Sequence, residues 1–120
     1  MTKLSLVLCL ATACTTNAPT GSSCPTANAP NYDNFARPFF ATYCAGCHSV
    51  QATDRHGAPD TQNYDSEDDI RLRARDIDLN AALGPDAANA TMPDLGGPVA
   101  HEPSDAEREQ LGKYLACLSR

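Results

Sequence analysis

The segment Cys44-Ala45-Gly46-Cys47-His48 constrains this chain more than any other feature of its sequence. Two thiols three residues apart on one turn of backbone can each add to one of the two vinyl groups of a haem, and the adjacent imidazole then reaches the iron from the same face. A Cys-x-x-Cys-His sequence is the pattern of c-type haem attachment. We therefore predict that Cys44, Cys47 and His48 bind one covalent haem c, with His48 as an axial iron ligand.

Three other kinds of site also use a Cys-x-x-Cys sequence. A thioredoxin-like redox site opens a helix after a buried strand, whereas the residues before Cys44 are helical in pattern. A structural zinc site needs four ligands, and the remaining Cys and His residues form no second close pair. A disulfide between Cys44 and Cys47 would close a small, strained loop. The pattern favours the haem site over all three.

The sequence lacks the patterns that are typical of β-strands. Val and Ile are scarce, Trp is absent, and no run alternates apolar and polar residues. We predict an all-α domain in which three to four short helices wrap around the haem. One helix begins at Arg37-Pro38, because proline is favoured in the first helical turn. A second runs from the N-cap Ser66 to Ala81, and the last begins at the capping box Ser104 to Glu107.

Two long loops connect these helices, Ser49 to Asp65 and Gly84 to Pro103. Loops of this length in a small domain usually carry function. The core and the haem surroundings are expected to come from the apolar residues of the helices and of the second loop. These are Phe39, Phe40, Tyr43, Leu72, Ile77, Leu95, Leu111 and Tyr114.

The second long loop contains a candidate for the other axial ligand. A haem that only transfers electrons usually holds two protein ligands, and Met/His ligation raises its potential relative to bis-His ligation. Met92 lies among Pro and Gly residues that suit a rigid loop laid against a flat cofactor, and Met1 would leave with a signal peptide. We predict Met92 as the ligand. The alternatives are His56, shortly after the Cys-x-x-Cys-His motif, and His101 on the same loop as Met92.

The order of these features resembles a monohaem c-type cytochrome of the small, soluble type I class. The resemblance covers Tyr32 to Arg120. It implies N- and C-terminal helices that cross near the haem edge, and a Met-Pro turn whose methionine, here Met92, completes the iron coordination. It also implies that the carbonyl of Pro59 accepts a hydrogen bond from the His48 ring nitrogen that does not bind iron, which fixes the orientation of the imidazole.

Such a protein is an electron carrier rather than an enzyme. The haem is expected to cycle between Fe(II) and Fe(III) and to exchange electrons with redox partner proteins. Two alternatives stay open: a haem-based sensor or ligand-binding domain with an open or weakly held sixth iron position, and an electron-delivery subunit of a larger oxidoreductase. The chain has 9 basic and 15 acidic residues and a net charge of −6, which argues against nucleic acid as a partner.

The first residues have the pattern of an export signal: Lys3, an apolar run over 4–10, and small residues at 11–13. We expect 1–13 to be a signal peptide, 14–30 a flexible polar tether and 31–120 the cytochrome c domain. Cys14 stands where bacterial lipoproteins carry their lipid-modified cysteine, although Ala11 replaces the usual leucine. An ordinary cleaved signal is the alternative to this lipid anchor. The expected location is periplasmic or on the outer surface, and no segment of the mature chain is long enough to span a membrane.

The chain has six cysteines. Two bind haem in this interpretation, Cys9 lies in the signal, and Cys14 is the candidate for lipid. Cys24 and Cys117 then remain as a natural pair in an oxidising compartment. We predict a disulfide between them, which the usual type I fold lacks.

Overall fold

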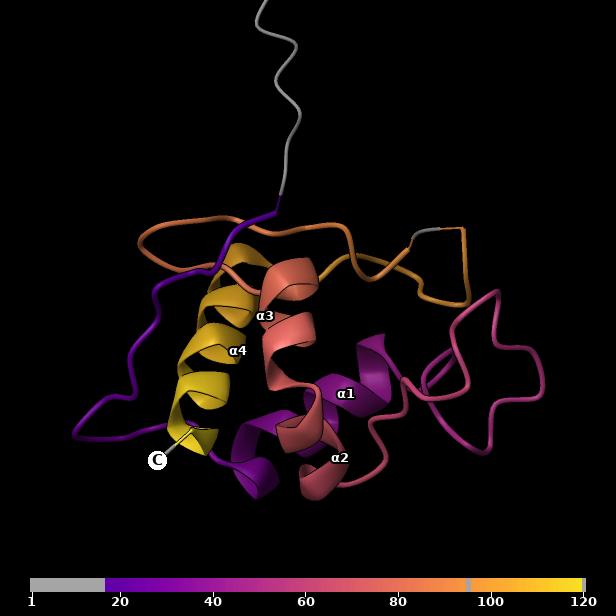
Figure 1. Cartoon of the computed structure of the whole chain (residues 1–120), viewed down its shortest axis with the longest axis horizontal. Helices are drawn as coiled ribbons and strands as arrows, with labels where there is room; N and C mark the ends of the chain where they lie inside the picture. Colours follow the sequence, from indigo (N-terminus) through magenta and orange to yellow (C-terminus); the bar gives the residue numbers. More distant parts are fainter. Residues whose placement is uncertain (1–16, 95, 120) are drawn as a thin grey trace, which may run out of the picture.

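The computed structural model describes residues 17–94 and 96–119. Within them a π-helical turn, η1 (Tyr32–Ala36), leads directly into the first of four α-helices (Figure 1). These are α1 (Arg37–Tyr43), α2 (Glu67–Leu72), α3 (Ala74–Ala81) and α4 (Asp105–Leu118). The described ranges contain no β-strand, only an isolated bridge between Leu83 and Ala88. The all-α prediction is confirmed.

Capping residues explain where the first and last helices begin. Asn31 and Asn34 bond to each other's backbone N–H groups at 2.8 and 2.9 Å, so helical structure starts at η1, before the predicted position. Pro38 lies in the first turn of α1, as predicted. At α4, Ser104 Oγ accepts the Glu107 N–H at 3.1 Å, and the Glu107 carboxylate accepts the Ser104 N–H at 3.2 Å. The sequence pattern for helix starts pairs Ser or Thr with Glu or Gln, which is why it predicted α4 but missed η1.

The predicted middle helix is in fact two helices. Its capping box is present, because Ser66 Oγ accepts the Asp69 N–H at 3.2 Å. The chain then leaves helical geometry at Arg73, with φ −113° and ψ 13°, and α3 follows as a separate element. Ile70 and Ile77 are both buried. Two short helices can bury residues at this spacing as well as one continuous helix can. Because neither Gly nor Pro stands at Arg73, the apolar pattern did not predict the break.

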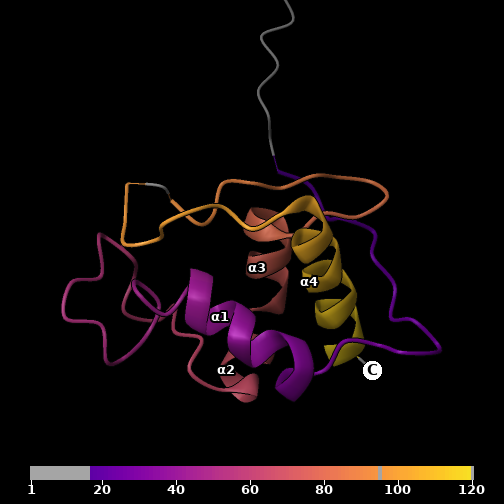
Figure 2. The same ribbon diagram turned by 180° about the vertical axis from the view of Figure 1, so that it is seen from behind.

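The hydrophobic core lies where α4 packs against α3 on one side and η1 on the other (Figure 2). Aromatic rings fill its centre: the Phe39 ring centroid lies 5.3 Å from that of Phe35 and 5.0 Å from that of Tyr43. Leu111 and Tyr114 of α4 close the cluster and are fully buried.

The predicted core residues are buried with one clear exception. Leu72 is 77% exposed, because it ends α2 at the break before Arg73. That prediction was wrong. Leu95 lies outside the described residues. The remaining predictions are buried, namely Phe39, Phe40, Tyr43, Ile77, Leu111 and Tyr114.

Residues 17–24, here called the N-terminal strap, do not form the flexible tether that was expected. Thr20 is only 1% exposed, and both its backbone N–H and its hydroxyl donate to the Asp78 carboxylate of α3. In Figure 1 the strap runs from the loop after α3 down along α4. A segment with little to bury can still be held by hydrogen bonds to a partly buried carboxylate, and its composition does not reveal this.

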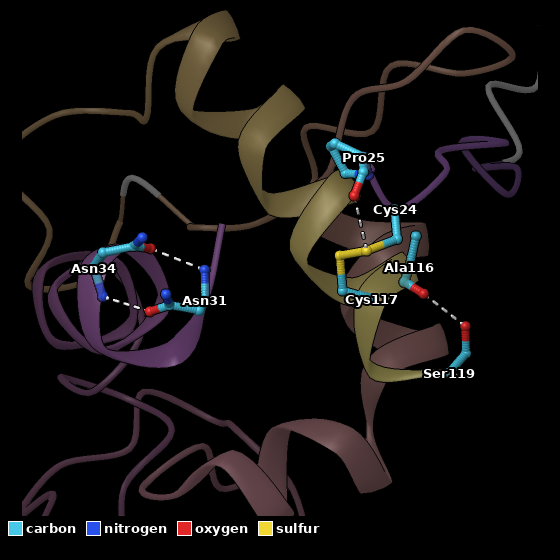
Figure 3. The surroundings of a disulfide bond; sticks show 7 residues. All are labelled: Cys24, Pro25, Asn31, Asn34, Ala116, Cys117 and Ser119. Atoms are coloured by element: carbon cyan, nitrogen blue, oxygen red, sulfur yellow. Dashed lines mark hydrogen bonds between the residues drawn. A yellow bond between two sulfur atoms is a disulfide. The ribbon is translucent and has the colours of Figure 1, made fainter. Parts of the chain in front are cut away.

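A disulfide joins the strap to the C-terminal helix. Cys24 and Cys117 are bonded, with their Cα atoms 4.6 Å apart (Figure 3). The predicted pairing is confirmed. The cross-link spans a sequence separation of 93 residues and ties the beginning of the described chain to its end.

None of the helices in the described ranges is long and apolar enough to cross a bilayer.

Candidate functional site

A cavity of about 620 Å³ opens between the loop after α1, helix α3 and the loop before α4. Its volume lies in the range of cofactor sites in proteins, about 300–1,000 Å³. Four of the predicted site residues line it together, Cys44, Cys47, His48 and Met92, and Pro59 is also in its wall. Residues that are 44 positions apart in the sequence are thus brought to one site. The rest of the lining includes apolar side chains, such as Phe39, Ile77 and Val99, and polar ones, such as Asp76 and Asn80.

The Cys-x-x-Cys-His segment forms one compact turn at the end of α1. The Cys44 N–H donates to the Phe40 carbonyl at 2.9 Å, and the Cys44 carbonyl accepts from Cys47 and His48 at 3.1 and 2.8 Å. Both thiols are free. The turn follows a helix rather than a buried strand, unlike a thioredoxin-like site. Among the described residues no group of three or more His, Cys, Asp or Glu side chains is placed to hold a metal ion.

Burial keeps both sulfur atoms protonated before any cofactor is attached. It raises the pKa of the Cys44 thiol to about 12, with a further contribution from Cys47 that the Arg108 cation partly offsets. Burial also raises the pKa of Cys47, and the carboxylates of Asp54 and Asp94 add to this effect. Neutral thiols are the groups that add S–H across a vinyl double bond.

The His48 ring is held by a backbone carbonyl, but not the one expected. His48 Nδ1–H donates to the Gln62 carbonyl at 2.7 Å, so the predicted role of Pro59 as acceptor was wrong. The Pro59 carbonyl is engaged by Arg55 Nη2 at 2.7 Å instead. With Nδ1 bonded, Nε2 is the nitrogen left to bind a metal. Burial lowers the pKa of His48 despite the Gln62 bond, which favours the neutral imidazole that metals bind.

Two residues that the sequence did not single out shape this proximal side. Arg55 donates to the carbonyls of Ser49 at 2.7 Å and Gln62 at 3.3 Å, and thereby fixes the loop that presents the His48 acceptor. The Tyr64 ring stacks on the His48 ring with centroids 4.7 Å apart. The one signal in the sequence that could have identified Arg55 is that it is the single arginine in the first long loop, Ser49 to Asp65.

Met92 is fixed through its backbone while its side chain is 38% exposed at the cavity. Its N–H donates to the Asn80 carbonyl at the end of α3, at 2.8 Å, and its carbonyl accepts from Arg108 Nη1, also at 2.8 Å. Of the two rivals, His56 lines the cavity, whereas His101 is not among the described lining residues and lies beside Tyr43, with ring centroids 5.7 Å apart.

Arg108 is a third residue that sequence analysis missed. It is 4% exposed and its Nη1 also donates to the Ala81 carbonyl at 2.8 Å, so it connects α3, α4 and the Met92 loop. Its Nη2 has no partner. An arginine in the first turns of an amphipathic helix normally indicates a solvated face, which is why the pattern gave no signal.

The loop that follows Met92 also closes against the Cys-x-x-Cys turn. A Cβ placed on Gly46 would lie 2.5 Å from Pro98 Cγ, and one on Gly97 would lie 3.5 Å from Cys47 Sγ. Glycine at position 46 is therefore required by the close approach of Pro98. The cavity, its two thiols, an oriented imidazole and a thioether on a backbone-fixed loop fit a haem bound through both cysteines.

Comparison with known protein families agrees with this geometry. The family described as Cytochrome c matches residues 36–119, which include η1's last residue, all four α-helices and every residue of the cavity discussed above. Searches of curated proteins and of solved structures each found no match. Because the family match covers more than half of the chain, this protein belongs to the cytochrome c family and has its helical fold.

Proposed function

We propose that this cytochrome c, whose family transfers electrons through haem, is an exported carrier with a single covalent haem that cycles between Fe(II) and Fe(III). Cys44 and Cys47 hold the haem as thioethers, and His48 and Met92 are its axial ligands. The observation that carries the proposal is the cavity, because its wall contains all four of these residues. It is not an enzyme in this proposal, and its partners are redox proteins rather than nucleic acid.

The haem supplies the one-electron chemistry, and the chain's own residues keep it in one geometry. The Gln62 carbonyl orients His48 at 2.7 Å. The hydrogen bonds of the Met92 backbone to Asn80 and Arg108 fix the position of the backbone that carries the thioether side chain. Neither ligand needs to move when the charge on the iron changes, and apolar side chains such as Phe39, Ile77 and Val99 form part of the cavity wall. A small rearrangement is what fast electron transfer requires.

The alternative of a sensor with an open or weak sixth position depends on Met92. A sensor needs a distal ligand that leaves easily, whereas Met92 is bonded through both its N–H and its carbonyl. This observation favours the carrier. An electron-delivery subunit would use the same site, so the two roles differ in the partner and not in the haem pocket.

Replacement of Met92 by alanine is expected to remove the distal ligand. An oxidised haem with a thioether ligand has a weak far-red absorption band, which Met92→Ala should abolish, and the reduction potential should fall because methionine ligation raises it. The measurement is a visible spectrum of the oxidised holoprotein with a redox titration. His101→Ala is the matched control and should leave the band unchanged. A band that survives Met92→Ala, or that His101→Ala abolishes, would contradict the assignment.

The proposed location depends on residues 1–16, which lie outside the described residues. We propose that 1–13 are a signal peptide and that Cys14 carries lipid. Stable attachment to a membrane would require two apolar anchors on the protein. Cell fractionation of wild type and Cys14→Ser tests this. We expect wild type in the membrane fraction and Cys14→Ser in the soluble periplasmic fraction. If both are soluble in the periplasm, only an ordinary export signal remains.

A further inference from the structure

The N-terminal strap lies against the segment that leads to Met92. Asn17 Nδ2 donates to Thr91 Oγ1 at 2.7 Å, directly before Met92 in the sequence. Three residues further along the strap, the Thr20 carbonyl accepts the Asp86 N–H at 2.9 Å. The strap therefore lies alongside residues 86–91, and in Figure 1 it continues down along α4.

Asn89 joins the strap to α3 through its side chain. It is 2% exposed. Its amide Nδ2 donates to the carbonyls of Ala18 at 2.7 Å and Asp78 at 2.8 Å, and its Oδ1 accepts the Ala18 N–H at 3.3 Å. Every polar atom of this side chain is thus used to connect three segments. Its backbone N–H also donates to the Ala82 carbonyl at 2.9 Å.

Thr20 makes the second connection between the strap and α3. Its N–H donates to Asp78 Oδ2 at 2.9 Å, and its hydroxyl donates to Asp78 Oδ1 at 2.6 Å. The strap also lies very close to the start of the loop, because a Cβ placed on Gly84 would be 2.6 Å from the Thr20 carbonyl oxygen. Hydrogen bonds to a charged group stabilise more than those between neutral groups.

On the inner side, the same loop is bonded to α4. Arg108 Nη1 donates to the Met92 carbonyl at 2.8 Å and contacts the Asn89 carbonyl at 3.4 Å. The residues before Met92 are thus enclosed between the strap and α4. The Cys24–Cys117 disulfide joins these two enclosing elements to each other.

We propose that Thr20 and Asn89 are positioning residues for the distal iron ligand, because they bind the strap across the loop that carries Met92. The inference rests on the proposed role of Met92. The strap keeps the loop closed, so the thioether is not displaced by competing ligands. Thr20 and Asn89 touch neither the cavity nor the iron ligands and act only through the loop.

The test uses the oxidised holoprotein and compares Thr20→Val, which keeps the shape of the side chain, with wild type. Two quantities are measured: hydrogen exchange of the Asn89 and Met92 backbone amides, and the rate at which added imidazole displaces the distal ligand. Thr20→Val removes the hydroxyl bond to the Asp78 carboxylate together with the hydroxyl's bonds to Ser22 within the strap. Loss of the hydroxyl should raise both quantities on the order of tenfold. Asn89→Ala should raise the exchange and displacement rates further. If Asn89→Ala does not fold, the comparison of Thr20→Val with wild type is sufficient for the test.

Two controls separate positioning from a general loss of stability. Thr42→Val removes a hydroxyl bond to the Pro38 carbonyl on the exposed face of α1, and should change neither quantity. The Tyr64 amide, which donates to the His48 carbonyl on the proximal side, should keep its exchange rate in Thr20→Val. Equal acceleration at Tyr64, or an unchanged imidazole rate, would overturn the proposal.

Failure of the proposed function gives a different result. If the wild-type protein lacks the far-red thioether band, Met92 is not the ligand, and the positioning role is overturned together with it. If the band is present but amide exchange of Asn89 and Met92 is insensitive to Thr20→Val, the ligand assignment stands and only the role of the strap is wrong.

Discussion

The double variant Cys44→Ser/Cys47→Ser is expected to lose covalent haem completely when it is expressed with the haem-attachment machinery. Serine hydroxyls do not form the thioether bonds that Cys44 and Cys47 provide. Acid-acetone extraction should leave the wild-type protein red and the double variant colourless. The single variants are the control, because each keeps one thiol and one possible thioether. Covalent haem in the double variant would contradict the proposed attachment.

The same variant is expected to lose much of its folded structure. The haem would occupy a cavity of about 620 Å³ whose wall includes the core residues Phe39 and Ile77. Without the haem these apolar side chains lose packing contacts, and the whole stability of a small domain is only about 5–15 kcal/mol. Far-ultraviolet circular dichroism should show reduced helicity. Wild-type helicity in haem-free protein would show that the cavity walls need no cofactor to fold.

Removal of the disulfide is expected to have the second largest effect. Cys24 and Cys117 are separated by 93 residues, and a cross-link across a loop of that length stabilises by up to about 4–5 kcal/mol through restriction of the unfolded chain. Cys24→Ser/Cys117→Ser should therefore unfold at a clearly lower denaturant concentration. The measurement is equilibrium unfolding of the holoprotein, followed by circular dichroism.

Addition of reductant provides the matched control for this prediction. Reduced wild type should unfold at the concentration found for the double variant, and the variant itself should not respond to reductant. Equal unfolding midpoints for oxidised wild type and the double variant would show that the cross-link adds no stability. Such a result would mean that the hydrogen bonds of the strap, among them those of Asn17, Thr20 and Asn89, hold it without help from the cross-link.

Sequence patterns predicted the helices whose ends are marked by local chemistry. Pro38 and the Ser104 capping box located α1 and α4 because these signals act within one helical turn. The break at Arg73 and the order in the strap depend on contacts between distant residues. Thr20 is held by Asp78, 58 positions away, and no local pattern records such a partner.

The candidate site divides in the same way. Cys44, Cys47 and His48 were identified because the chemistry of attachment requires a fixed spacing in one short segment. The acceptor for His48 was misplaced by three residues, since the Pro59 carbonyl accepts from Arg55 and from the Gln62 N–H, whereas the imidazole shares the Gln62 carbonyl with Arg55. Arg108 was missed because its burial follows from how α4 packs against α3 and the Met92 loop.

The fixed start of the strap has a consequence for a lipid-anchored chain. Asn17 is bonded to Thr91, and only three residue steps separate it from Cys14, a reach of about 10 Å at full extension. If Cys14 carries lipid as proposed, the domain would be tethered by these few residues instead of by the whole segment 14–30 that composition suggested. The edge of the domain that bears Met92 would then lie at the bilayer surface. Electron donors or acceptors in the same membrane would meet that edge. Freely diffusing proteins would reach the domain from its other sides.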